Sequence, residues 1–323
     1  MTAPRPQATD DLSILTVRLA SPRGFCAGVE RAIRTVEDTL SQYGRPVFVR
    51  HEIVHNVHVV SRLAAMGAVF VESLDEVPSD RPVVFSAHGA PISAHQKADS
   101  RHLVKIDATC PLVLKVHNQT RRHIAAGRHV ILIGHAGHPE VIGTMGQAPD
   151  GGSITLIETE DEASKVSLPD APLAYVTQTT LSVDETRGII DVLKSRFPDI
   201  AGPAKEDICY ATSNRQAAVK ATAPGTDLFV VIGSETSSNS VRLVETALAA
   251  GSAKAVLTDG ADSFDWSLCD AARSIGVSAG ASAPEELVEA FLTTLAKKRP
   301  IKIESVETAK ENIVFKPALR LAS

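Results

Sequence analysis

Short apolar runs alternate with longer amphipathic segments along most of this chain. The runs ILTVRLA, PVFVR, HVILIG and DLFVVIG are predicted strands, and each is separated from the next by segments with helical periodicity. Glycines such as Gly44 and Gly127 follow the helical segments, as is typical of helix ends. This alternation predicts an α/β fold with parallel or mostly parallel sheets.

One local pattern occurs three times: an apolar strand, a cysteine, a helix that ends at a glycine, and a second strand that ends in polar residues. The intervals from cysteine to glycine are 18, 17 and 16 residues (44−26, 127−110, 225−209). We therefore expect three pseudo-symmetric α/β units of about 100 residues each, arranged around a common centre. The cysteines of the pattern are Cys26, Cys110 and Cys209.

Polar side chains follow two predicted strands in each unit. Ligands of parallel α/β units bind where the carboxyl ends of strands lead into helices, so we expect these side chains to surround one site. They are His55 and His88 in the first unit, His138, Glu140 and Thr179 in the second, and Ser237, Ser238, Asn239 and Ser282 in the third.

The repeat also predicts the domain boundaries. Residues 1–12 are rich in proline and polar residues and are predicted to be a disordered leader. Domains are expected at residues 13–107, 108–206 and 207–299. Residues 300–323 alternate like a strand at first and are predicted to be a tail that packs on another domain.

Composition limits the classes of function. Apolar residues make up 44% of the chain and charged residues 22%, as in an ordinary globular protein. The formal charge of −5 and the lack of a Lys/Arg block argue against nucleic acid as a partner. We find neither a signal-peptide apolar region nor a run long enough for a membrane helix, so we expect a cytoplasmic protein without a membrane partner.

The three repeated cysteines each stand at a strand-to-helix turn, where helix N–H groups favour a thiolate. Their separations, 84 and 99 residues (110−26, 209−110), exclude a short zinc knuckle. Three thiolates can hold an iron–sulfur cluster and leave one iron open to a substrate. Cys269 lacks a polar cluster and has no counterpart in the repeats, so a buried apolar role is predicted for it.

The residues His51 to His55 form a literal HExxH. On a helix this motif would place two imidazoles on one face for zinc. Here it continues a strand-like run, in which residues four apart are separated by roughly 13 Å, too far to bind one ion. A zinc hydrolase is therefore a minor alternative.

The hydroxyl, amide and imidazole groups favour recognition of phosphate, because helix N-termini with nearby hydroxyls bind anions without a Lys or Arg. Helix capping is the simpler explanation for any one such cluster. The chain has neither GxxxxGK[ST] nor GxGxxG, so a P-loop and a Rossmann dinucleotide site are not indicated. Glu140 is the only carboxylate inside these clusters, which suits proton delivery.

Together these segments resemble the IspH/LytB family of 4-hydroxy-3-methylbut-2-enyl diphosphate reductases over residues 14 to 320. The motifs that carry the resemblance are PRGFCAGVERAI, HEIVHN, FSAHG, DATCPLVLKVH, GHAGHPEVIGTMGQ, TQTTLS, ICYATSNRQ, GSETSSNS and AGASAP. The resemblance implies the last step of the non-mevalonate isoprenoid pathway, a reductive dehydroxylation that yields isopentenyl and dimethylallyl diphosphate. It also implies three α/β domains around a central cluster.

Residue by residue, the resemblance implies that Cys26, Cys110 and Cys209 bind a 4Fe-4S cluster with an open apical iron. It implies that Glu140 is the proton donor and that Thr179 lies beside the substrate hydroxyl. His138 is expected to act in both catalysis and binding. The implied diphosphate-binding residues are His55, His88, His138, Ser237, Ser238, Asn239 and Ser282.

The chain has no flavin or nicotinamide motif, so electrons must come from outside. The resemblance implies a ferredoxin or flavodoxin, with its reductase, as the donor. A non-catalytic iron–sulfur sensor built on the same cysteines is the main alternative to the enzyme.

Overall fold

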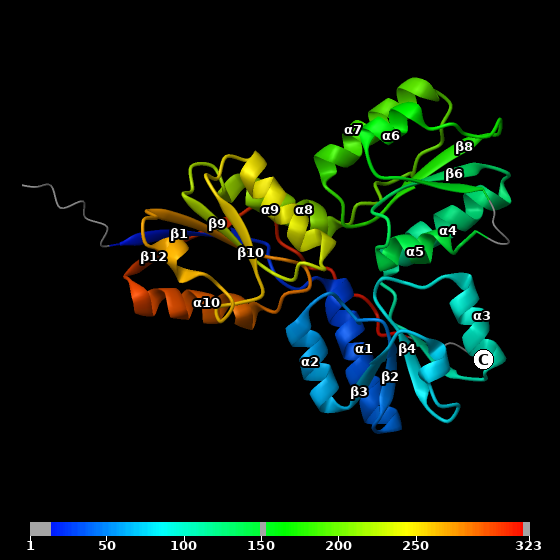
Figure 1. Ribbon diagram of the computed structural model, residues 1–323, viewed down its shortest axis with the longest axis horizontal. Helices are drawn as coiled ribbons and strands as arrows, with labels where there is room; N and C mark the ends of the chain where they lie inside the picture. Colours follow the sequence, from blue (N-terminus) through cyan, green and yellow to red (C-terminus); the bar gives the residue numbers. More distant parts are fainter. Residues whose placement is uncertain (1–13, 149–152, 319–323) are drawn as a thin grey trace, which may run out of the picture.

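The computed structural model describes residues 14–148 and 153–318, so the predicted leader lies outside the described residues. Three α/β lobes surround a common centre (Figure 1). Each lobe is built on one sheet, and every strand pair within the described residues is parallel. The predicted fold class is confirmed. None of the helices within these residues combines the length and apolar character needed to cross a membrane.

The first unit has a four-stranded sheet of order β3-β2-β4-β5. Its elements are α1 (Ala27–Tyr43), β2 (Val47–Arg50), α2 (Val57–Met66), β3 (Ala68–Val71), η1 (Leu74–Glu76), β4 (Pro82–Phe85), α3 (Ile92–Ser100) and β5 (Val104–Asp107).

The second unit has a three-stranded sheet of order β7-β6-β8. Its elements are α4 (Pro111–Ala125), β6 (His129–Ile133), α5 (Pro139–Met145), β7 (Ile154–Ile157), α6 (Glu160–Lys165), β8 (Leu173–Thr177) and α7 (Val183–Arg196).

The third unit has a five-stranded sheet of order β10-β9-β11-β1-β12. Its elements are β1 (Leu15–Ser21), α8 (Tyr210–Thr222), β9 (Leu228–Ile232), α9 (Ser238–Ala249), β10 (Ala255–Thr258), η3 (Trp266–Cys269), β11 (Ser274–Ala279), α10 (Glu285–Lys298) and β12 (Ile301–Glu307).

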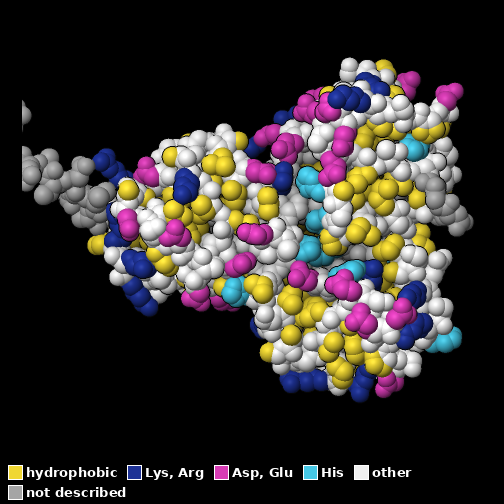
Figure 2. Space-filling model, viewed as in Figure 1, with side chains coloured by type: hydrophobic (Ala, Val, Ile, Leu, Met, Phe, Trp, Pro, Cys, Tyr) yellow, Lys and Arg dark blue, Asp and Glu magenta, His cyan; other side chains and the backbone are white. Residues whose placement is uncertain are grey.

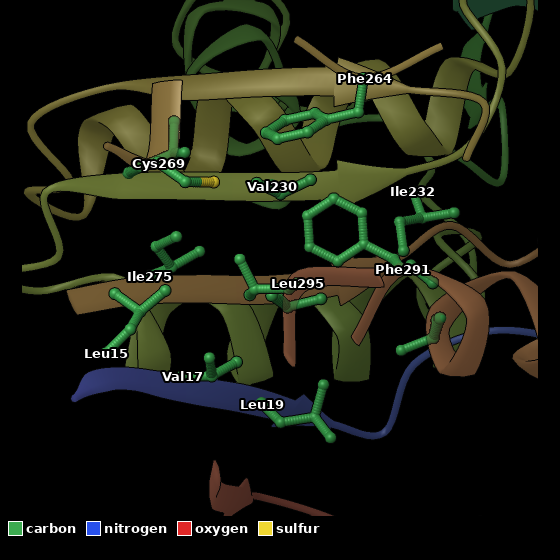
Figure 3. Packing of buried hydrophobic residues seen from close by; sticks show 14 of the residues in the cluster. Leu15, Val17, Leu19, Val230, Ile232, Phe264, Cys269, Ile275, Phe291 and Leu295 are labelled. Atoms are coloured by element: carbon green, nitrogen blue, oxygen red, sulfur yellow. The ribbon is translucent and has the colours of Figure 1, made fainter. Parts of the chain in front are cut away.

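The core of the third unit shows why β1 belongs there. Leu15, Val17 and Leu19 alternate along β1 and are buried against β9, β11 and α10 (Figure 3). Both edges of β1 are paired, one with β11 and the other with β12. The prediction that this strand opens the first unit is therefore wrong, because its hydrogen-bonding partners lie more than 250 residues later in the chain.

The chain changes sheets at each repeated cysteine. β1 lies in the third sheet, but the helix after Cys26 leads to β2 in the first; β5 lies in the first sheet, and the helix after Cys110 leads to β6 in the second. The helix after Cys209 leads from the second unit to β9 in the third. One detail of the predicted pattern is wrong, since no strand directly precedes Cys209.

The C-terminal segment contributes to two units. Residues 301–307, predicted as the start of a tail, form the edge strand β12 of the third sheet. The following residues run back toward the junction of the lobes (Figure 1, red). There the backbone carbonyl of Lys316 accepts a hydrogen bond from Arg31 Nε at 2.9 Å, and Ala318 packs on the core of the first unit.

Candidate active site

The order of the strands explains why polar residues from three units converge. In each sheet the order in which strands are added changes sense between two neighbouring strands, so that the helices after them lie on opposite sides of the sheet's switch point. These pairs are β2 and β4, β6 and β8, and β9 and β11. A crevice forms outside the carboxyl ends of strands at such a switch point. All predicted polar site residues follow one of these six strands, and the three crevices open toward one another.

One cavity of about 100 Å³ lies at this junction. Histidine side chains line the hollow where the three lobes meet (Figure 2). The lining includes all twelve of the predicted site residues: Cys26, His55, His88, Cys110, His138, Glu140, Thr179, Cys209, Ser237, Ser238, Asn239 and Ser282. Three distant parts of the chain thus contribute to a single site.

Each of the three repeated cysteines is the N-cap residue of its helix, α1, α4 or α8. Cys209 Sγ accepts the backbone N–H of Thr212 at 3.4 Å. A Cβ atom built on Gly28 would lie 2.7 Å from Cys110 Sγ and 3.8 Å from Cys26 Sγ. The glycine therefore leaves room between two sulfurs that a side chain would fill.

The three cysteines are half-buried, and the partial removal of their thiols from water is the main cause of their raised pKa values. The pKa of Cys110 rises to about 12 and that of Cys209 to about 11, each further raised by the neighbouring Cys26 thiol. As free groups these thiols are protonated at neutral pH. A cationic iron–sulfur group would favour their deprotonation, since metal binding displaces thiol protons. The donor set, three sulfurs facing one cavity, fits such a group.

The backbone ties each cysteine to a loop that carries a polar site residue. The amide of Cys26 donates to the carbonyl of Ala281 at 3.2 Å, next to Ser282. Cys110 donates to Ala87 at 3.0 Å, next to His88, and Cys209 donates to Thr179 itself at 3.0 Å. The sulfur side and the polar side of the cavity are therefore fixed relative to each other by main-chain bonds.

Three imidazoles form a cluster on the polar side. The rings of His55 and His88 stack with centroids 4.1 Å apart, and His138 meets both rings edge-on at 5.5 and 5.9 Å. Burial, followed by the proximity of His55, lowers the pKa of His138 to about 3 and that of His88 well below its usual value. Without an anion beside them, His88 and His138 are therefore neutral at pH 7.

In two of these imidazoles, hydrogen bonds determine which ring nitrogen carries the proton. The backbone N–H of Glu140 donates to His138 Nδ1 at 3.1 Å, so the neutral ring carries its proton on Nε2. His55 Nδ1 lies 3.0 Å from Glu52 Oε2 and donates to it, and His55 Nε2 is buried without a partner. These ring nitrogens are available to a bound ligand.

Asn239 contributes the least satisfied polar group of the site. Its side chain is 4% exposed, and neither its amide nitrogen nor its oxygen has a hydrogen-bond partner. It lies in the first turn of α9, which Ser237 caps by accepting the N–H of Ser240. Since an unpaired buried amide is destabilising by about 1–3 kcal/mol, this side chain is placed for a ligand rather than for stability.

Glu140 is buried in the first turn of α5, with 2% of its surface exposed. The backbone N–H and the Oγ1 hydroxyl of Thr179 donate to its two carboxyl oxygens at 2.6 and 3.0 Å. Burial nevertheless dominates and raises the pKa of Glu140 to about 7, against the lowering effect of the Thr179 bonds. The group can therefore hold and release a proton near neutral pH.

The HExxH motif is not helical. β2 ends at Arg50, and His51 adopts the left-handed conformation with φ of 58°, which ends the strand. The prediction that the motif continues a strand is thus wrong, but the helical context that a zinc protease needs is absent from it. His51 points to Glu72, and His55 lies in the cavity.

Sequence reasoning missed several contributors. Gly28, Val54, Thr180 and Thr212 also line the cavity. Gln178 is buried behind it, where its amide nitrogen donates to Thr180 Oγ1 at 2.9 Å and its oxygen accepts the N–H of His135 at 3.0 Å. The sequence TQTT held a signal for Gln178 and Thr180, because both directly follow a buried strand.

The chain is similar to known proteins over most of its length. Residues 17–296 match the family model described as LytB protein. Proteins of Hyphomonas neptunium and Phenylobacterium zucineum, both named 4-hydroxy-3-methylbut-2-enyl diphosphate reductase, are 58% and 57% identical to this chain. The first alignment covers 94% of this chain and 96% of the relative, and the second covers 95% and 98%.

Two solved structures of reductases are similar as well. The Plasmodium falciparum E-1-hydroxy-2-methyl-but-2-enyl-4-diphosphate reductase superposes with a TM-score of 0.88 at 36% identity, covering 95% of both chains. The second is described as (E)-4-hydroxy-3-methyl-but-2-enyl diphosphate reductase, the terminal enzyme of the non-mevalonate pathway. It has a TM-score of 0.61 at 30% identity and covers 88% of this chain and 100% of its own. On the family match and these identities, the chain belongs to the LytB protein family.

Proposed function

We propose that this protein is a 4-hydroxy-3-methylbut-2-enyl diphosphate reductase. It removes the allylic hydroxyl of its substrate as water and forms isopentenyl and dimethylallyl diphosphate. The observation that carries this proposal is the single cavity that joins three half-buried cysteines to unpartnered polar groups and a carboxyl group able to hold a proton. The family membership and the named relatives support the same activity.

Cys26, Cys110 and Cys209 would hold a 4Fe-4S cluster with one iron free of protein ligands. That group would pass the two electrons of the reaction, one at a time, from an external donor to the substrate, and it would supply a Lewis-acidic iron. The chain has no motif for another redox cofactor, so the electrons would come from a ferredoxin or flavodoxin and its reductase.

The diphosphate would bind among His55, His88, His138, Ser237, Ser238, Asn239 and Ser282. None of the residues that line the cavity is a lysine or arginine. Negative charge would instead be met by N–H and O–H donors and by the N-terminus of α9, an arrangement that binds phosphate well. A bound anion would also raise the pKa values of His88 and His138, so that these neutral rings take up protons as the substrate enters.

Glu140 would deliver a proton to the leaving oxygen. Loss of one hydroxyl as water consumes two electrons and two protons, and one proton must reach that oxygen. Glu140 can carry it because burial raises its pKa to about 7. The two Thr179 donors hold the carboxyl group in place, and Thr179 lines the cavity. Its hydroxyl would lie beside the reacting carbon–oxygen bond.

The test is to measure iron, sulfide and zinc on protein purified without oxygen, and then turnover of the hydroxy-methylbutenyl diphosphate in the same sample with a chemical reductant. Near four irons with sulfide, and both isomeric diphosphates as products, are expected. Iron and sulfide without turnover, even with a ferredoxin or flavodoxin system added, would favour a sensor. Stoichiometric zinc without sulfide would contradict the proposal altogether.

A further inference from the structure

Each of the three cysteine-capped helices carries a basic residue five or six positions after its cysteine: Arg31, Lys115 and Arg215 (31−26, 115−110, 215−209). None of them lines the cavity. All three donate to backbone carbonyls of the segment that precedes the next repeated cysteine around the site. Arg31 also donates to Lys316 in the C-terminal segment, and Arg215 to Ala211 of its own helix. This recurrence at equivalent positions is independent of the groups that would bind substrate.

Arg31, on α1, contacts the loop before Cys110. Its Nη1 donates to the carbonyl of Thr109 at 3.0 Å, and its Nη2 donates to that of Asp107 at 3.4 Å. Its Nε donates to the carbonyl of Lys316 in the C-terminal segment. The helix that starts at Cys26 therefore supports the loop that carries Cys110.

Lys115, on α4, contacts the loop before Cys209. Its Nζ donates to the carbonyls of Lys205 and Glu206 at 2.9 and 2.8 Å and pairs with Asp207 Oδ1 at 3.1 Å. The Asp207 side chain is fully buried, and its other oxygen accepts the backbone N–H of Thr177. The helix that starts at Cys110 therefore supports the loop that carries Cys209.

Arg215, on α8, contacts the loop before Cys26 and is itself fully buried. Its Nε and Nη2 donate to the carbonyl of Gly24 at 2.9 and 2.7 Å, and Nη2 also donates to that of Phe25 at 3.0 Å. The charge is balanced by Glu311 of the C-terminal segment, 3.0 Å from Nη1. The helix that starts at Cys209 thus supports the loop that carries Cys26.

We propose that Arg31, Lys115 and Arg215 are positioning residues that hold the cysteine loops at the spacing that the cluster requires. We call the bonds of each residue to the segment before the next cysteine a clasp, and the three clasps together the ring. The proposal rests on the proposed function for the identity of the bound group. Each clasp joins the cysteine-capped helix of one unit to the segment through which the chain leaves that unit for the next cysteine, and the direction is the same at every step. Since rigid support of ligand loops reduces the ordering needed on binding, the ring prepares three cysteines from three units for one group.

The ring makes a directional prediction for backbone hydrogen exchange in the iron-free protein. Arg31→Met should speed exchange by about tenfold in the segment that leads to Cys110, since each loop loses bonds from one clasp only. The double variant Lys115→Met/Asp207→Asn should do so in the segment leading to Cys209, and Arg215→Met/Glu311→Gln should do so before Cys26. Each double variant avoids leaving a carboxylate without its cation. In each case the other two cysteine loops should exchange as in the unchanged protein.

Two controls distinguish the support of one cysteine loop from a general effect on the stability of the fold. Arg196→Met removes an arginine that donates to the carbonyls of Ala163 and Val166 within one unit, and should leave all three cysteine loops unchanged. Lys115→Arg keeps a cationic donor and should restore slow exchange before Cys209. Faster exchange in the variant's own helix, or equal changes in all three loops, would overturn the proposal. So would no change in the loops of the Arg31 and Lys115 variants.

A second readout uses the iron-loaded protein without its substrate. Loss of iron to a chelator, followed by the decay of cluster absorbance, should be about tenfold faster in each clasp variant than in Arg196→Met, since support around ligands of this kind typically changes metal affinity 10- to 100-fold. Equal rates would contradict the ring. Absence of iron from the unchanged protein would instead contradict the proposed function, and the exchange experiment on the iron-free chain would still decide the ring.

Discussion

Two groups of side chains in the same cavity differ in how completely they are hydrogen-bonded. The carboxyl oxygens of Glu140 accept two hydrogen bonds from Thr179, at 2.6 and 3.0 Å. Both amide atoms of Asn239 and the Nε2 atom of His55, by contrast, are buried without any partner. All three side chains line the site, so the difference does not come from exposure.

The difference indicates which groups already have their hydrogen-bond partners before substrate binds. Glu140 is held in one position with its proton affinity already adjusted, as a proton donor must be before the reaction. Asn239 and His55 are incomplete, and a buried polar group without a partner is destabilising unless a ligand satisfies it. We therefore propose that Glu140 is prepared for chemistry and that Asn239 and His55 are prepared for binding.

Glu140→Gln should have the largest effect. The amide is close in shape but cannot give up a proton at neutral pH, so turnover should fall by about 10²- to 10⁴-fold, the range typical of a lost general acid. Substrate affinity and iron content should change little. Single-turnover kinetics with equilibrium binding would separate the two effects, with Glu162→Gln on α6 as a control. Turnover within a factor of two of the unchanged protein would remove Glu140 from the mechanism.

Asn239→Ala should affect binding and spare the free protein. Substrate affinity should fall by roughly 10- to 100-fold, because a buried donor and acceptor are lost. The free energy of unfolding without substrate should be unchanged or higher, since the variant removes an unsatisfied amide. Binding titrations and denaturant unfolding measure the two quantities, and Asn118→Ala on the surface of α4 is the control. Lower stability at unchanged affinity would contradict the assignment of Asn239 to binding.

The pH dependence should follow Glu140. Because burial raises its folded pKa to about 7, above that of the unfolded chain, the folded state holds a proton that the unfolded state has lost. Its contribution to stability is therefore greatest below the unfolded pKa and is lost as pH rises through about 7. kcat/KM should also fall about tenfold per pH unit above that value. The pH dependence of stability and that of kcat/KM near pH 7 should both disappear in Glu140→Gln. If either persists in this variant, another group is responsible for it.

Cys269→Ser should have the smallest effect on function. Cys269 is 4% exposed and packs with Val230, Ile275 and Leu295 in the core of the third unit, away from the cavity (Figure 3). Iron content and turnover should match those of the unchanged protein, while stability should fall by about 1 kcal/mol because a hydroxyl replaces an apolar sulfur in the core. Loss of iron in this variant would show that the threefold assignment of the cysteines is incomplete.

The sequence predicted the site well because its signals are local. A cysteine at a strand-to-helix turn, or a serine after a buried strand, is recognisable from a few neighbouring residues. The parallel fold and the convergence of strand ends follow from the same periodicity. All twelve predicted residues line one cavity, although their individual roles stay predictions.

The sequence did not predict features that depend on distant partners. The pattern of β1 predicts a strand but not a sheet, because alternation specifies which face is buried and not which strand is paired. Its partners β11 and β12 are decided by the packing of Leu15 and Val17 against the core of the third unit. The left-handed conformation of His51, which ends β2, likewise had no local signal.

By itself, then, the sequence determined most helices and strands, the residue types at each strand end and the threefold repeat of the cysteine pattern. These features depend on residues close together in the chain. Only the tertiary structure decided that Glu140 is satisfied and Asn239 is not, and that Arg215 reaches the loop before Cys26. Those facts depend on burial and on hydrogen bonds between segments up to 191 residues apart, which no local pattern encodes.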